Sequence, residues 1–340
     1  MENRARIFLA WKFFGGVVLL GAISFLGFLL FKEFVLDTQT ILSYLIAHST
    51  SLTNYLAYKI ENATPLNPYF YGGFLCLLIA ERLMPAKKAQ KMFSVGMLQD
   101  IAWFLANKVP LTFVDFFNAV ILSFFYKEYL AFLTIDVTTW PQIYRLIMAL
   151  LLGDFLGFFH HYVRHKVELF WYFHTIHHSQ REMNPFADHR NHFLESMIAF
   201  MIAFIPSQMF QLDTISTGYF IVFMSWYTRF YHSNIRTNLG FLKHFLVTPQ
   251  SHRIHHSIED RHMDKNFSTL FTIWDRLFGT LYKNYDEYPD TGIAGYRFPL
   301  ETSAKGLSTL ATYWAQTIYP FRLIRERIGK VFYSESELAR

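Results

Sequence analysis

Residues 146–165 decide the fold, and they read Leu146-Ile-Met-Ala-Leu-Leu-Leu-Gly-Asp-Phe-Leu-Gly-Phe-Phe-His-His-Tyr-Val-Arg-His165. The run from Leu146 to about Tyr162 is rich in apolar residues and is close to the length that about 30 Å of hydrocarbon requires of a helix. His161 and His165 stand four residues apart at its end, so on a helix both imidazoles point to the same face. The stretch therefore predicts a membrane-spanning helix that carries two candidate metal ligands to the membrane surface.

Further apolar stretches predict a polytopic membrane helical bundle, all-α in class. They cover residues 13–31, 63–80, 109–126, 197–211 and 214–228. We interpret the first of these stretches as an anchor rather than a signal peptide, because no obvious small-residue cleavage site follows it. Asp115 and Asn118 make the third stretch also suited to a re-entrant or interfacial helix, so four to six spans are expected.

The basic residues orient this bundle in the membrane. Arg4, Arg6 and Lys12 precede the first stretch, and further lysines and arginines follow the second stretch and occur in the C-terminal tail. Because basic loops stay on the cytoplasmic side, both termini and every histidine cluster are expected there. The sequence thus predicts an integral, multi-pass protein of a bacterial inner membrane or of the endoplasmic reticulum, with a histidine-rich cap on the cytosolic side.

The composition excludes several classes of protein. Of the 340 residues, 52% are hydrophobic, 19% aromatic and 17% charged, against about 25% charged residues in soluble proteins. This balance excludes a disordered chain and a coiled coil. The net charge of +5 is too small to predict nucleic-acid binding. Cys76 is the single cysteine, which excludes an intramolecular disulfide framework and multi-thiolate metal sites.

Histidine is concentrated in one part of the chain, because 13 of the 15 histidines lie between His160 and His256. Three motifs hold eight of them: His161-x-x-x-His165, His174-x-x-His177-His178 and His252-x-x-His255-His256. Eight imidazoles exceed the four ligands of a structural zinc site, so the motifs predict two metal ions with open coordination positions. Imidazole by itself does not identify the metal, since zinc, copper, iron and nickel all accept it.

Charged residues accompany these motifs. Asp154 lies seven residues before His161, nearly two helical turns, and so shares its face. We interpret Asp154 as an acceptor for the N–H of a metal-binding histidine, or as a ligand itself. Arg164, Arg190 and Arg253 lie beside the histidines. They are interpreted as solvated charges of the cytoplasmic side, with a lipid headgroup or a redox partner as the alternative contact.

The sequence lacks the motifs of several other enzyme classes. There is no H-E-x-x-H motif of zinc proteases, and no G-x-S-x-G nucleophile elbow. A carboxylate-bridged di-iron bundle needs two Glu-x-x-His motifs, and only Glu259-Asp-Arg-His262 fits that pattern.

The segments around the histidines resemble the fatty acid hydroxylase/sterol desaturase superfamily over about residues 146–282. Asp154, His161 and His165, followed by Leu169-Phe-Trp-Tyr-Phe-His174-Thr-Ile-His177-His178-Ser179, resemble its first two boxes. The later elements follow in order: Arg190-Asn-His192-Phe-Leu-Glu195, His232-Ser-Asn-Ile235, Thr248-Pro249-x-x-His252-Arg-x-His255-His256-Ser257, Asn266-Phe267 and Trp274-Asp-Arg-Leu-Phe-Gly-Thr280. Phe193 and Ser268 depart from the pattern, because they stand where proline and glycine are usual.

The resemblance implies a membrane enzyme with a non-haem di-iron centre that uses O₂ to hydroxylate or desaturate a C–H bond of a lipid. It implies electrons from a separate cytochrome b5-, ferredoxin- or reductase-type protein, since no such domain is recognised in the chain. Asp154 is assigned to the catalytic site. The residues implied as ligands of the two iron ions are His161, His165, His174, His177, His178, His192, His232, His252, His255 and His256.

We expect three parts: an N-terminal membrane extension with two spans (1–100), the catalytic domain (101–285) and a C-terminal tail (286–340). Residues 306–332 of the tail alternate apolar and basic residues at helical spacing, which suits a membrane-surface helix or, equally, a packed helix. The leading function is a lipid hydroxylase or monooxygenase. The alternative is a membrane metal-binding or metal-transport protein without turnover, but a transporter places its polar residues near the bilayer midplane, whereas these lie where spans end.

Overall fold

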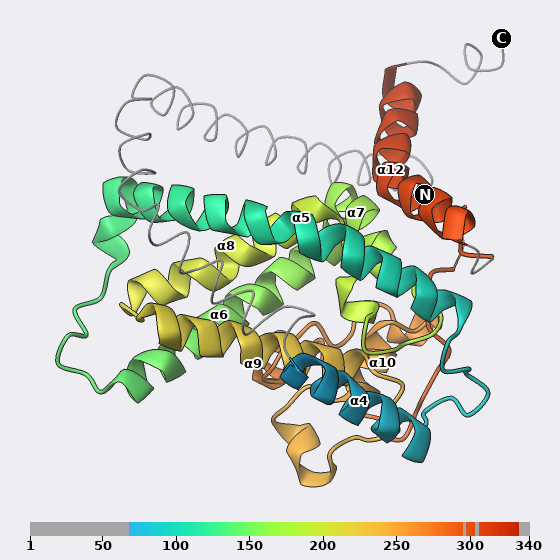
Figure 1. Ribbon diagram of the computed structural model, residues 1–340, viewed down its shortest axis with the longest axis horizontal. Helices are drawn as coiled ribbons and strands as arrows, with labels where there is room; N and C mark the ends of the chain where they lie inside the picture. The colour runs from blue at the N-terminus through green and yellow to red at the C-terminus, as the bar shows by residue number, and fades with distance from the viewer. Residues whose placement is uncertain (1–67, 295–296, 303–305, 333–340) are drawn as a thin grey trace.

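The computed structural model describes residues 68–294, 297–302 and 306–332. The predicted span 13–31 lies outside these residues, and the predicted span 63–80 lies only partly within them. The described residues form helices joined by turns and loops, with three isolated β-bridges and no strand among them (Figure 1). The prediction of an all-α class is therefore confirmed for the described residues, whereas the polytopic membrane bundle stays a prediction.

Four long helices run side by side and form a bundle (Figure 1). They are α5 (Val95–Phe125), α6 (Gln142–Lys166), α8 (Phe193–Met209) and α9 (Thr214–His232). α6 packs against both α8 and α9, and α5 packs against α8. At one end the loop before α6 meets the turn between α8 and α9, where Gln211 Nε2 donates to the carbonyl of Ile135 at 2.9 Å. The histidine motifs lie at the opposite end, so the bundle separates an apolar body from a histidine-rich end.

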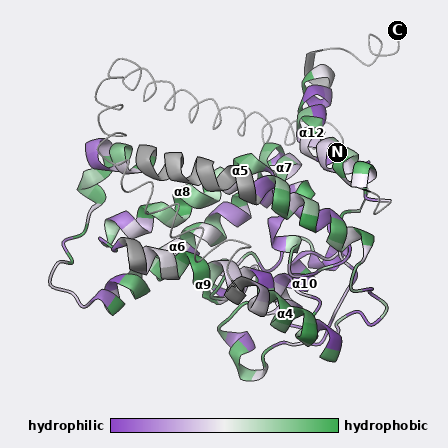
Figure 2. Ribbon diagram, viewed as in Figure 1, coloured by the Kyte–Doolittle hydropathy of each residue, from purple (hydrophilic) through white to green (hydrophobic). Residues whose placement is uncertain are grey.

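Three shorter helices surround the histidine end, namely α7 (Glu168–His178), α10 (Pro249–His255) and α11 (Ile273–Leu277). Two more helices, α4 (Pro68–Leu83) and α12 (Gly306–Phe332), lie on the outside of the bundle. A π-helical turn (Tyr126–Leu130) extends α5, and four 3-10 turns cover Ala131–Leu133, Ala187–His189, Gly240–His244 and Asp260–His262. Figure 2 shows hydrophilic residues in purple around α7 and α10, near the histidine motifs.

Local capping residues set where two of these helices begin. The side chain of Asp213 accepts a hydrogen bond from the backbone N–H of Ser216 and so starts α9. Thr248 and Ser251 form a reciprocal capping box at the start of α10, with Pro249 in the first helical position. The cap of α10 therefore holds a short helix of only seven residues that carries two of the predicted ligands.

The outer helices are joined to the bundle by specific contacts. On α4, Phe74 stacks on Phe186 with the ring centroids 4.3 Å apart. On α12, Gln316 accepts a hydrogen bond of 2.8 Å from the indole N–H of Trp103 in α5. The described parts of the predicted N-terminal extension and tail thus pack on the region that carries the histidine motifs. The other face of α12 exposes apolar side chains such as Leu307 and Trp314, and its contact with a membrane surface stays a prediction.

Four of the six predicted spans fall on the bundle helices. Residues 146–162 lie in α6, 197–211 extend two residues past α8, 214–228 lie in α9, and 109–126 end one residue past α5. Among the described residues, α6 is the one helix long and apolar enough to cross a membrane by length and composition. α8 is apolar but shorter. The number of crossings therefore stays a prediction.

Candidate metal centre

Nine histidines form two groups at one end of the bundle. Within each group, one ring nitrogen from every residue lies within 4.8 Å of the others. Group A contains His161, His165, His174, His178 and His255, and group B contains His177, His232, His252 and His256. The histidines come from the end of α6, from α7, from the end of α9 and from α10 with the residue that follows it. Segments far apart in the sequence therefore meet at one place.

Each H-x-x-H-H motif is divided between the two groups. In α7 the first and last histidines, one turn apart, join group A, whereas His177 joins group B. In the α10 motif the first and last histidines join group B, and His255 joins group A. The rings of His178 and His256 stack across the boundary with their centroids 4.4 Å apart. The repeated motif thus builds two neighbouring sites rather than one.

Hydrogen bonds at Nδ1 direct the Nε2 atoms of group A toward one another. His161 Nδ1 donates to the carbonyl of Phe267, and His255 Nδ1 donates to that of Lys265, both at 2.9 Å. A carbonyl only accepts, so in both rings Nδ1 carries the hydrogen and Nε2 carries the lone pair. These two Nε2 atoms and that of His174 are buried and have no hydrogen-bond partner within the described chain. Buried acceptors that face one another in this way fit a bound cation.

In group B, His232 shows the same Nδ1 hydrogen bond, and the Nε2 atoms of the group lie close together. His232 Nδ1 donates to the carbonyl of Thr228 at 2.8 Å, which leaves its Nε2 as an acceptor. This Nε2 lies 2.8 Å from His252 Nε2 and 3.2 Å from His177 Nε2. His256 Nε2 lies 3.1 Å from His252 Nε2. Nitrogens that bind one ion at about 2.1 Å lie about 3–4 Å from one another, so the spacing is close to that of a four-imidazole metal site.

Burial favours the neutral form of these imidazoles. Loss of hydration is the main cause that lowers the pKa well below 6.5 for His174, His177, His178, His252 and His256. A neutral ring keeps the lone pair that metal binding requires. The donor sets of groups A and B therefore fit two metal ions, and iron is among the metals that imidazole accepts.

Glu195 orients one ring of group A, although the sequence analysis gave it no role. Its Oε1 lies 3.1 Å from His174 Nδ1 and 3.2 Å from Nη1 of Arg164. The carboxylate thus holds Nδ1 and leaves His174 Nε2 for group A, as carboxylates beside metal-binding histidines do. Its position three residues after His192, in a segment already singled out by its motif, was the signal that could have identified it.

The structure gives the Asp154 carboxylate other hydrogen-bond partners than the histidine predicted for it. Its carboxylate accepts four hydrogen bonds at 2.7–3.0 Å, from Thr269 Oγ1, the backbone N–H groups of Leu270 and Phe271, and Trp274 Nε1. These donors occupy its acceptor positions, and no histidine bonds to it within the described chain. Asp154 instead ties α6 to the residues that follow Phe267. The carbonyl of Phe267 in turn accepts the hydrogen bond from His161 Nδ1.

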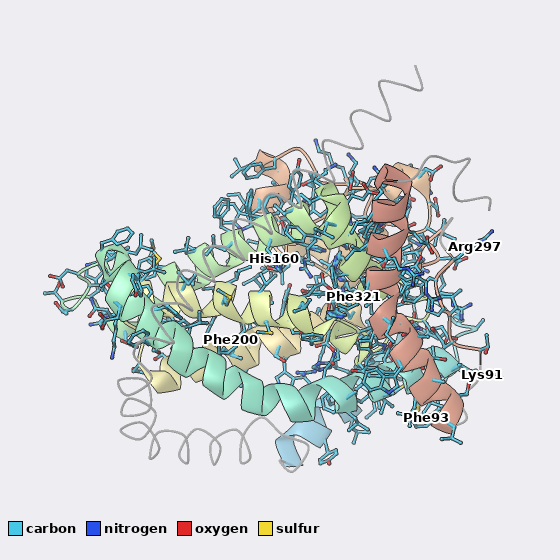
Figure 3. All side chains as sticks on the ribbon, turned by 90° about the horizontal axis from the view of Figure 1, so that it is seen from above. Lys91, Phe93, His160, Phe200, Arg297 and Phe321 are labelled. Carbon is cyan, nitrogen blue, oxygen red and sulfur yellow. The ribbon has the colours of Figure 1, made fainter. Side chains whose placement is uncertain are left out.

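His192 lies outside both groups, so its prediction as a ligand is not supported by its position. It is the N-cap of α8, where its Nδ1 accepts a hydrogen bond from the backbone N–H of Leu194 at 3.3 Å. Its ring packs against Phe173 and Phe321. His160, labelled in Figure 3, also joins neither group, as expected.

Two of the arginines beside the motifs are buried, which corrects their interpretation as solvated charges. Arg190 forms ion pairs with Asp100 at 2.6 Å and with Glu301 at 3.2 Å. Arg253 Nη2 donates to Oδ1 of Asn234 at 2.9 Å. Partners of this kind offset the cost of burying a charge, so these arginines join α5, the tail and the α9–α10 loop around the histidines.

A third group of possible ligands contains Glu259, His262 and Glu287. Arg261 Nη2 lies 2.7 Å from a carboxylate oxygen of each glutamate. The guanidinium therefore already supplies the positive charge at this position, and the group is an ion-pair cluster.

A cavity of about 320 Å³ opens beside groups A and B. Histidines of both groups line it: His161, His174, His177, His232 and His252. Much of the remaining wall comes from apolar residues of α6, α8 and α9. The volume is at the lower end of the range of about 300–1,000 Å³ for small-molecule sites. The two groups thus face a confined and largely apolar space between the bundle helices.

Comparison with known proteins points to one family. Residues 146–280 match the family model described as fatty acid hydroxylase. The human alkylglycerol monooxygenase is 26% identical over 238 residues, which are 64% of this chain and 51% of the human protein. The alkylglycerol monooxygenase of Xenopus tropicalis is 33% identical over 132 residues, 37% of this chain and 28% of that protein.

A bacterial relative has a different named substrate. An ornithine lipid hydroxylase of Rhizobium tropici is 26% identical over 160 residues, 46% of this chain and 47% of that protein. The chain thus spans about half of the length, or less, of these relatives. No solved structure matches the chain. The matched relatives are lipid hydroxylases or monooxygenases by name, and the matched region contains both histidine groups.

Proposed function

Residues 146–280 belong to the fatty acid hydroxylase/sterol desaturase superfamily, and from this premise we propose that the chain is a membrane-bound, O₂-dependent lipid hydroxylase. The observation that carries the proposal is the meeting of two imidazole groups with one largely apolar cavity. In this proposal groups A and B hold two iron ions. When bound, iron supplies the redox chemistry with O₂ that oxidation of an unactivated C–H bond requires.

The residues of the chain hold the site in place and keep water from it. The carbonyls of Phe267, Lys265 and Thr228 accept the Nδ1 hydrogens of three histidines and thereby set the direction of Nε2. The Phe267 ring is fully buried and contacts rings of group A, including His165. It therefore helps to exclude water from the reacting atoms. The apolar wall holds the lipid chain so that one C–H bond stays beside both groups, which favours reaction there.

We place the site at the cytoplasmic end of the membrane-spanning helices, with electrons arriving from a separate carrier protein. His165 is the one member of groups A and B that is only partly buried. Group A therefore lies closest to the surface at which a carrier would bind. Residues 1–100 and 286–340 act in this proposal as a membrane extension and a surface tail.

Lipid profiles of cells test the proposal directly. Cells that express the chain should contain a lipid that has gained one oxygen, or has lost two hydrogens if the enzyme desaturates. Cells that express His177→Ala should lack this product, whereas His244→Ala, which changes an exposed histidine outside both groups, should still form it. Unchanged lipids in cells with the wild-type chain, together with retained metal, would favour the alternative of a metal-binding or metal-transport protein.

A further inference from the structure

Two segments that are distant in sequence form one exposed apolar surface outside both histidine groups. The first segment is residues 239–246, whose 3-10 turn projects from the body of the molecule at the bottom of Figure 1, and the second is residues 271–280, which include α11. Thr272 joins them, because its backbone N–H donates to the carbonyl of Phe245 at 2.9 Å and its Oγ1 donates to that of His244 at 3.0 Å. Six large apolar side chains of these segments, which we call the apolar patch, are between 49% and 74% exposed: Phe241, Leu242, Phe245, Ile273, Leu277 and Phe278. Single exposed apolar side chains are common, but a cluster of this kind indicates an interaction surface.

The exposed charges of the two segments are basic. Their charged residues are Lys243, Arg276 and a single acid, Asp275. Asp275 is 1% exposed and so presents no negative charge at the surface. Arg276 is exposed, and its Nη2 donates to the carbonyl of His244 at 2.9 Å, which holds the guanidinium beside the apolar patch. Large apolar side chains together with basic ones fit the interface of a bilayer that contains anionic lipids.

The apolar patch is continuous with an exposed apolar face of α6. The ring centroid of Phe155 in α6 lies 5.0 Å from that of Trp274 and 6.4 Å from that of Phe278. Leu151 and Met148 precede Phe155 by four and seven residues and so share its face, and both are exposed. Among the described residues, α6 is the one helix long and apolar enough to cross a membrane. Lipid that surrounds this face of α6 therefore also reaches the apolar patch.

We propose that the apolar patch is a membrane contact, seated in the leaflet at the histidine end of the bundle, with Lys243 and Arg276 at its anionic headgroups. The inference concerns how the chain sits in the bilayer and does not depend on the proposed hydroxylation. Phe155 precedes His161 by six residues, or about 9 Å along α6, so the patch lies on the bundle side of the histidines. Thr269, two residues before the second segment, lines the cavity, so this contact brings the cavity wall beside the bilayer surface.

Site-specific fluorescence tests where the apolar patch lies. Because Cys76 is the single cysteine, Cys76→Ser gives a cysteine-free full chain into which Phe241→Cys or Leu277→Cys is introduced, one in each segment. Each protein is labelled with the fluorophore NBD and placed in nanodiscs of phosphatidylcholine and phosphatidylglycerol. We expect lipids with a doxyl group on the acyl chain to quench both labels, and iodide in the water to leave them unquenched. Lys88→Cys, at an exposed lysine in the loop after α4, is the matched control and should show the reverse pattern.

The contribution of the basic residues is tested with Lys243→Gln in the protein labelled at Phe241→Cys. A basic residue near an anionic surface strengthens the attraction to it about fivefold, so the ratio of shielded to iodide-accessible label should fall by about that factor. In nanodiscs of phosphatidylcholine alone, the variant and its parent should behave alike. Lys88→Gln removes the same charge outside the two segments and should change nothing. An unaltered ratio in Lys243→Gln overturns the assignment to an anionic lipid surface.

The quenching pattern also decides between a bilayer and other occupants. Either label quenched by iodide as strongly as the label at Lys88→Cys shows a surface that faces water and overturns the inference. Labels shielded from both quenchers indicate cover by a second copy or another protein and overturn it as well. If one of the labelled variants does not fold, Leu242→Cys or Ile273→Cys reports on the same segment. A chain that seats the patch in lipid but forms no oxidised lipid in cells overturns the proposed function alone.

Discussion

Replacing Glu195 with glutamine tests whether its carboxylate orients His174. Glu195 is 6% exposed, and its Oε1 lies 3.1 Å from His174 Nδ1 and 3.2 Å from Arg164 Nη1. Glutamine keeps the shape and one carbonyl oxygen, but it removes the negative charge and places an NH₂ group where the second oxygen stood. Arg164 then loses its counter-ion, and His174 competes with it for a single neutral acceptor.

The expected loss of stability follows from these two contacts. Hydrogen bonds to charged groups contribute about 1.5–3 kcal/mol each, and breaking a buried ion pair costs about 3–5 kcal/mol. The side chain of Arg164 keeps 16% exposure and thus some hydration. We therefore expect Glu195→Gln to lower the free energy of unfolding by about 3 kcal/mol, at the low end of that range. Because Glu195 also orients a proposed ligand, metal affinity should fall by about 10–100-fold.

Thermal unfolding in detergent and chelator titration measure these two effects. Glu259→Gln is the matched control, because Glu259 pairs with Arg261 at 2.7 Å on the surface, where both side chains are exposed. Water screens an exposed pair, which therefore contributes little to stability, so the control should melt and hold metal almost as the wild type does. A Glu195→Gln protein with wild-type stability and wild-type metal retention would refute the orienting role.

Four further outcomes are expected. His255→Ala removes a proposed ligand and should abolish turnover while the chain still inserts in the membrane. His48→Ala lies outside the three histidine motifs and should be silent in the same activity and membrane-fractionation assays. Protein from iron-replete cells should contain two redox-active iron ions per chain, and one ion by elemental analysis, or no O₂-dependent spectral change after reduction, would contradict this. Asp154→Ala should lower the thermal unfolding temperature strongly, because it leaves four donors without an acceptor at about 1–3 kcal/mol each. Metal-free protein should lose stability as the pH falls from about 6.5 toward 4. Burial lowers the pKa of His255 to about 4, so in this window the unfolded chain binds more protons than the folded protein. Chemical denaturation at several pH values across this window measures the loss.

Local spacing along the chain was sufficient to identify the class of fold and most of the candidate site. Apolar stretches of helical length predict an all-α protein, because the helical repeat and side-chain hydropathy are properties of neighbouring residues. The same repeat places His174 and His178 on one face of a helix, whatever that helix packs against. The ordered motifs over residues 146–280 also identified the superfamily, as the family match confirms.

Only the tertiary structure decided how these residues are used. His177 and His178 are neighbours in sequence but lie in different groups, because α7 faces α6 on one side and the end of α9 on the other. Asp154 shares a helical face with His161, yet its partners lie more than a hundred residues away, beginning with Thr269.

His192 and Glu195 show the same limit. Both stand in one short motif, but His192 caps its own helix while Glu195 reaches His174. The spacing of residues on one helix sets the direction of each side chain about that helix. Which donors and acceptors meet that side chain depends on how separate helices pack, and this packing is set by contacts between distant parts of the chain.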